Sequence, residues 1–82
     1  MALKPGDDVR VVRLDRNGAD HLVVHEAQRA PRLGDRGSIL EVRGSGDELR
    51  YLVEADDGDG EAIWLAEFGV DELQLESEFG QR

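Results

Sequence analysis

Four carboxylates lie close together in a glycine-rich stretch of the chain: Asp56, Asp57, Asp59 and Glu61. Carboxylate oxygens are ligands that Ca²⁺ prefers, so this acidic loop is a candidate cation site. The spacing does not match a helix-flanked calcium loop, which needs ligands at alternate positions, then a glycine, then a second helix. Aspartate and glycine are also typical of tight turns. The sequence therefore favours a hairpin turn, with weak cation binding as the alternative.

The two histidines, His21 and His25, stand four residues apart, which on a helix would place both imidazoles on one face. A metal site needs at least one more ligand. A pairing of either ring with Asp20 or Glu26 would lack a cysteine nucleophile, because the chain has no cysteine. We therefore expect histidines that pack in a loop or face solvent, and we expect no metal, no cofactor and no enzymatic activity.

Trp64 is the only tryptophan, and its orientation decides what surface the domain presents. On a strand, alternation places Trp64 on the face opposite Ile63 and Leu65. Turned outward, it would belong to an apolar patch that binds a protein partner or a second copy. The members of this predicted partner-binding patch are Trp64, Leu52 and Phe68, with Leu40 beside them and Glu54 and Glu67 at its flanks. Turned inward, Trp64 would belong to the core or lie under residues 19–33, and the sequence leaves both orientations open.

Length and charge restrict the class of protein. A chain of 82 residues forms one domain and buries only about 60–65% of the surface of its unfolded form, so a deep active site is not expected. No apolar run is long enough to span a membrane, and the N-terminus lacks the apolar core of a signal peptide, which makes the cytoplasm the default compartment. The net charge of −9 repels phosphate backbones and suits a basic partner, although it also serves solubility.

Short apolar segments separated by glycine and aspartate predict an all-β fold. The expected strands are residues 8–14, 37–43, 49–54, 61–67 and 73–75. The expected turns are 15–18, where Asn-Gly is a strong hairpin signal, then 44–47 and 56–60. Residues 69–73 are expected to form a single helical or 3₁₀ turn before the last strand.

Between the first two strands, residues 19–33 form one long excursion whose apolar members Leu22, Val23 and Val24 are expected to cap an open end of the domain. Gly34 and Gly37 are expected to frame the turn that leads into the second strand. The domain is expected to span residues 1–76, followed by a polar tail, 77–82.

The layout resembles a known type of small barrel. Its motifs are Lys4-Pro-Gly-Asp-Asp-Val-Arg-Val, then Leu33-Gly-Asp-Arg-Gly-Ser-Ile-Leu-Glu-Val, Tyr51-Leu-Val-Glu and Asp71-Glu-Leu-Gln-Leu. Over residues 3–76 it is similar to the five-stranded SH3-like barrels of the nitrile hydratase β-subunit, of the variable chain of ferredoxin–thioredoxin reductase, and of short bacterial proteins of unassigned function. The resemblance implies a closed barrel with an accessory role. It transfers no metallocentre, because that of nitrile hydratase belongs to the other subunit.

These observations favour a non-enzymatic interaction or accessory module that binds a protein partner, basic or a second copy, through its outer surface. The alternative is a barrel associated with nucleic acid through a local basic patch. The arginines available for that patch are Arg10, Arg13, Arg29, Arg32, Arg36, Arg43 and Arg50. Because the overall charge is negative, we expect nucleic acid to be the less favoured partner.

Overall fold

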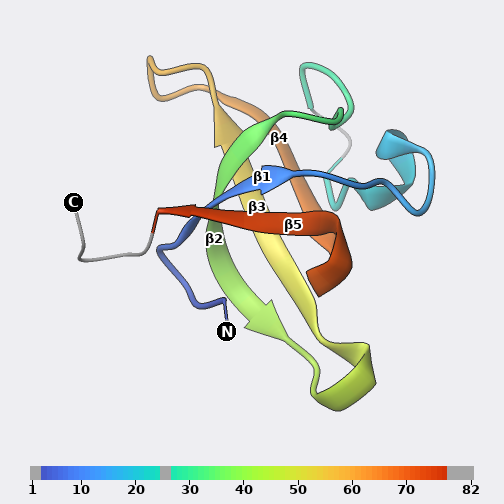
Figure 1. Cartoon of the computed structure of the whole chain (residues 1–82). Helices are drawn as coiled ribbons and strands as arrows, with labels where there is room; N and C mark the ends of the chain where they lie inside the picture. Colours follow the sequence, from blue (N-terminus) through green and yellow to red (C-terminus); the bar gives the residue numbers. More distant parts are fainter. Residues whose placement is uncertain (1–2, 25–26, 78–82) are drawn as a thin grey trace.

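The computed structural model describes residues 3–24 and 27–77, and these form one five-stranded antiparallel sheet with three 3₁₀ turns (Figure 1). The strands are β1 (Asp8–Val11), β2 (Arg36–Arg43), β3 (Arg50–Asp56), β4 (Ala62–Phe68) and β5 (Leu73–Ser77). The 3₁₀ turns are η1 (Gly18–His21), η2 (Gly46–Glu48) and η3 (Val70–Glu72). The strand order is β4-β3-β2-β1-β5, so the last strand returns to pair with the first.

The predicted all-β class, the five strands, the long excursion after the first strand and the 3₁₀ turn before the last are confirmed. The predicted closure into a barrel is not seen in the strand pairing, because β4 and β5 are the two end strands of the order and no pairing joins them among the described residues. Ser77 belongs to β5 and not to the predicted tail, the rest of which lies outside the described residues.

Two local predictions near the excursion are wrong. The first strand ends at Val11 and not at residue 14. Asn17 and Gly18 do not make a hairpin turn but begin η1, where the Asp20 amide donates to the Asn17 carbonyl at 2.8 Å. The reason is tertiary: Gly18 packs so closely on the backbone of Pro31 that an added Cβ would overlap its carbonyl oxygen. The contact of Gly18 with Pro31, in the returning part of the excursion, therefore decides the local conformation, and the preference of Asn-Gly for a hairpin turn does not.

The core lies between the two parts of the bent sheet. In Figure 1, β1 and β5 run across the direction of β3 and β4. Irregularities in register between β1 and β5, β2 and β3, and β3 and β4 are the bulges that allow such bending. The buried cluster comprises Val9, Val11, Ile39, Tyr51, Val53, Ala55, Trp64, Ala66, Phe68 and Leu73.

The excursion covers the outer edge of β4. Leu22 forms an antiparallel bridge with Ala66, and the Val23 amide donates to the Leu65 carbonyl at 3.0 Å. Paired edge groups are unavailable for uncontrolled pairing with other chains. Of the three residues predicted to cap the domain, only Leu22 packs against the core, whereas Val23 and Val24 are 42% and 41% exposed.

Gly37 is needed because β2 and β3 approach closely at this point. A Cβ on Gly37 would lie 2.7 Å from the Glu54 carbonyl oxygen and 2.7 Å from Val53 Cγ1. We expect Gly37→Ala to lower the free energy of unfolding by about 1–3 kcal/mol, the usual cost of overpacking, in urea titrations. The matched control is Gly69→Ala, whose Cβ would meet the flexible Arg50 guanidinium at 3.3 Å and Glu72 Oε1 at 3.7 Å, an ordinary contact distance. Equal unfolding midpoints for the two variants would contradict the close approach.

Candidate functional site

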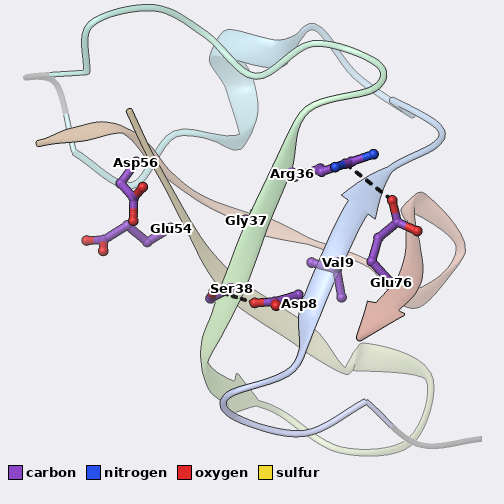
Figure 2. Close-up of a pocket in the computed structure, with 8 residues that line it drawn as sticks. All are labelled: Asp8, Val9, Arg36, Gly37, Ser38, Glu54, Asp56 and Glu76. Atoms are coloured by element: carbon purple, nitrogen blue, oxygen red, sulfur yellow. Dashed lines mark hydrogen bonds and ion pairs between the residues drawn. The ribbon is translucent and has the colours of Figure 1, made fainter. Parts of the chain in front are cut away.

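A hollow of about 390 Å³ opens on the surface where β1, β2, β3 and β5 contribute side chains (Figure 2). Its lining consists of Asp8, Val9, Arg36, Gly37, Ser38, Glu54, Asp56 and Glu76. The antiparallel register explains the gathering, because Ser38 pairs with Asp8 on one side and with Glu54 on the other. Residues in such a cross-strand row point to the same face of a sheet.

On one side of this hollow the charges are compensated. Glu76 Oε1 accepts from Arg10 Nη2 at 2.6 Å and lies 3.4 Å from Arg36 Nε. The Ser38 hydroxyl donates to Asp8 Oδ1 at 2.9 Å. Figure 2 shows Glu76 and Arg36 directed toward one another beside β1. This side therefore offers few free acceptors to a ligand.

The opposite side carries two carboxylates whose charge is not compensated. The Glu54 side chain has no hydrogen bond or ion pair within the part of the chain that the structure describes. Among those same residues, Asp56 accepts only from the Gly58 amide, at 3.0 Å. Both come from β3, and Figure 2 shows them on the same side of β2. Paired carboxylates of this kind accept strong charge-assisted hydrogen bonds from an ammonium or guanidinium group.

The predicted acidic loop begins at Asp56, the last residue of β3, and continues through the turn between β3 and β4, which Asp57 helps to shape. Asp57 Oδ1 accepts from the amides of Asp59, at 2.8 Å, and Glu61, at 3.3 Å. Within residues 3–24 and 27–77 no three His, Cys, Asp or Glu side chains are placed to hold a metal ion. Of the four loop carboxylates only Asp56 lines the hollow.

The predicted outward patch around Trp64 is wrong, and the inward alternative is the one the structure has. Trp64 is 1% exposed and meets Phe68 edge to face, with ring centroids 5.5 Å apart. Its indole N–H donates to Asp35 Oδ2 at 3.0 Å. Trp64 and Phe68 point to the core face of β4, and Glu67, which directly precedes Phe68, points to the opposite face. Leu52 pairs with Glu67 and therefore also lies on that opposite face. The predicted residues therefore divide between the two faces of the sheet.

His21 is a loop-packing residue, held in a buried polar cluster. Its Nε2 lies 2.6 Å from Glu72 Oε2, its Nδ1 lies 3.1 Å from the Asn17 carbonyl, and its ring stacks on Phe68. The two ring nitrogens are thus both within hydrogen-bond distance of acceptors. The cluster fastens the excursion to η3, and His25 lies outside the described residues.

Glu72 is the acceptor at the centre of this cluster. Burial opposes its ionisation, but hydrogen bonds from the Asp15 and Gly69 amides and from the His21 ring outweigh burial and hold the Glu72 pKa below its ordinary value of 4.5. Glu72 could not be singled out from the sequence, since the alternation of strand residues says nothing about a carboxylate in a 3₁₀ turn.

Most arginines of the predicted basic patch lie beside carboxylates. Five of the seven form ion pairs: Arg10 and Arg36 with Glu76, Arg13 with Asp15, Arg29 with Asp35, and Arg43 with Glu41 and Glu67. These pairs are spread over the sheet and the excursion. Their charge is compensated locally, which weakens the case for a nucleic-acid surface.

A second hollow, of about 540 Å³, lies between η2 and η3. It also contains carboxylates, among them Asp47 and Asp71, but it holds Arg50 as well. Its other carboxylate, Asp15, pairs with Arg13 at 2.7 Å. The second hollow is therefore a matched control for the first hollow.

Comparison of the chain with protein-family models, with curated proteins and with solved structures finds no match. The fold shown is thus a small all-β domain with a five-stranded antiparallel sheet. Among the described residues, no helix has the length and apolar character needed to cross a membrane.

Proposed function

We propose that this domain is a non-enzymatic interaction module that binds a basic segment of a protein partner at the Glu54 and Asp56 side of the hollow. The observation that carries the proposal is the contrast across the hollow: Glu76 is shared by two arginines, whereas Glu54 and Asp56 have no cationic partner among the described residues. A lysine or arginine side chain supplies the missing charge and the missing donors.

The proposal includes an SH3-like barrel in an accessory role. The order β4-β3-β2-β1-β5, the long excursion after β1 and η3 before β5 support that assignment. A basic protein is favoured over a second copy as the partner, because two chains that each carry a charge of −9 repel one another.

The charge contacts alone give weak, salt-sensitive binding. Exposed ion pairs contribute roughly 0.2–1 kcal/mol each and are screened by salt. Loss of both carboxylates therefore removes about 0.4–2 kcal/mol and weakens binding by about two- to thirtyfold.

The test uses the peptide Lys-Lys-Gly-Ser-Gly-Ser, titrated into the ¹⁵N-labelled domain at low salt. We expect the double variant Glu54→Gln, Asp56→Asn to bind it about two- to thirtyfold more weakly than the unmodified chain. The control is Asp47→Asn, Asp71→Asn, which removes the same charge from the second hollow and should bind like the unmodified chain. Equal weakening in both variants would mean that only net charge matters, and no weakening in either would place the peptide elsewhere; each result contradicts the proposal.

A further inference from the structure

The face of the sheet opposite the core carries apolar residues that the core does not use. Leu52 is buried, yet it lies outside the core cluster, and it pairs with Glu41 on β2 and with Glu67 on β4. Leu65 pairs with Glu54, so it lies on this same outer face, diagonal to Leu52. Leucines and glutamates thus alternate across β3 and β4.

An ion pair accounts for the burial of Leu52. Arg43 Nη1 on β2 lies 2.8 Å from Glu67 Oε2 on β4, so this pair bridges the two strands that flank β3. Leu52 is on β3 and is the cross-strand partner of Glu67. The centre of the outer face is therefore covered by the Arg43 and Glu67 side chains, and apolar surface is available on either side of it.

The apolar surface extends beyond β4 onto the excursion. Leu22 bridges to Ala66 and packs against the core, so the next residue, Val23, lies on the outer side next to Leu65. The hydrogen bond from the Val23 amide to the Leu65 carbonyl, 3.0 Å, fixes this pairing. Val23 is 42% exposed and Leu65 is partly buried.

At the other end, β2 contributes Leu40. Ile39 faces the core opposite Val53, and Glu41 is exposed opposite Leu52, so the irregularity between them leaves the extra residue, Leu40, on the outer side. Leu40 is 47% exposed. We call Val23, Leu65, Leu52 and Leu40 the outer stripe.

The outer stripe adjoins the hollow at Glu54. Glu54 lines the hollow and is also the cross-strand partner of Leu65, so one ligand can reach both. The stripe is flanked by Glu41, Glu54 and Glu67, and of these only Glu54 lacks a cationic partner in the described part of the chain. The surface is thus apolar on both sides of the Arg43–Glu67 ion pair and acidic beside Leu65, where it meets the hollow.

We infer that the outer stripe and the hollow form one docking surface for a basic amphipathic segment of a protein partner, with its apolar side chains on the stripe and its lysine or arginine at Glu54. The inference rests on the proposed function and adds the apolar half of the partner. Charge complementarity favours this occupant, whereas a second copy of the chain would bring the same glutamates together.

The test compares two peptides, Lys-Lys-Gly-Leu-Gly-Leu and Lys-Lys-Gly-Ser-Gly-Ser. We expect the leucine peptide to bind the unmodified domain about tenfold more tightly, since it adds apolar contact to the same charges. The double variant Val23→Ser, Leu40→Ser should lose most of that gain and bind the serine peptide unchanged. The control is Val12→Ser, Leu33→Ser, which changes two exposed apolar residues outside the stripe, 44% and 62% exposed, and should keep the gain.

The outcomes separate the two proposals. If the leucine peptide gains nothing, or if the stripe variant and its control keep the gain equally, the docking surface is wrong while the charge site stands. If both peptides bind but neither depends on Glu54 and Asp56, the proposed function is wrong. Amide shifts of the unmodified domain with the leucine peptide give a reading that needs no variant, and shifts absent from Val23 and Leu65 would overturn the inference.

Discussion

Replacing Trp64 with alanine is expected to lower the free energy of unfolding by about 3–5 kcal/mol, the usual cost of truncating a large buried aromatic residue. The side chain is 1% exposed, packs against Phe68 and donates to Asp35, so the variant loses packing and leaves a partly buried acceptor short of one donor. The total stability expected for a domain of this size is about 4–12 kcal/mol. A large fraction of the variant would therefore be unfolded at moderate temperature, as urea titration and near-ultraviolet circular dichroism would report.

Two further variants serve as controls for Trp64→Ala. Leu33→Ala, at a residue 62% exposed, should change stability by about 0.5 kcal/mol or less. Trp64→Phe keeps an aromatic ring and removes the donor to Asp35, so its cost should fall between the other two. If Trp64→Ala unfolds at the same urea concentration as the unmodified chain, Trp64 does not contribute to the core, and this fold is contradicted.

Replacing Glu72 with glutamine is expected to cost about 3–5 kcal/mol, because a neutral amide takes the place of a buried carboxylate that accepts from three donors. Glu72 accepts from the Asp15 amide at 3.0 Å, the Gly69 amide at 2.9 Å and the His21 ring at 2.6 Å. Thermal unfolding at neutral pH measures the loss. The matched control, Glu48→Gln, changes an exposed glutamate in η2 and should have little effect.

The same carboxylate gives a pH dependence with a definite sign. The folded pKa of Glu72 lies below its ordinary value of 4.5, so its stabilising contribution is fully present above about pH 4.5 and is lost as the pH falls through the folded value. The pKa of Asp35 is also lowered, from 3.8, because hydrogen bonds from Arg29, the Arg32 amide and Trp64 outweigh burial. The difference in stability between the unmodified chain and Glu72→Gln should therefore shrink below pH 4.5. A difference that stays constant down to pH 3 would contradict a Glu72 carboxylate that is ionised in the folded state.

The sequence predicted the strands because their residues alternate between apolar and polar and end at glycine or aspartate. Alternation divides a strand into two faces but does not say which face is inside. Whether Trp64 lies on the inner or the outer face depends on the register between β3 and β4, in which Leu52 pairs with Glu67. Register is set by contacts between segments that are distant in sequence, and a bulge changes it without a clear local signal.

Because strand pairing cannot be read from the sequence, only part of the candidate site was predicted. Glu54 and Asp56 were among the predicted residues, as a flank of the patch and as part of the acidic loop. Asp8, Ser38 and Glu76 were not, because they reach the hollow only through the pairing of β1 with β2 and with β5. The polar alternation at Asp8 and Ser38 was a usable signal, but the sequence alone did not show that these positions lie side by side.

The most direct test of the docking surface is the map of amide shift changes when Lys-Lys-Gly-Leu-Gly-Leu is titrated into the ¹⁵N-labelled domain. We predict that the largest changes fall on Ser38, Glu54 and Leu65, where the hollow meets the outer stripe. Changes centred on Asp47 and Asp71 in the second hollow, or no saturable changes at all, would contradict the account.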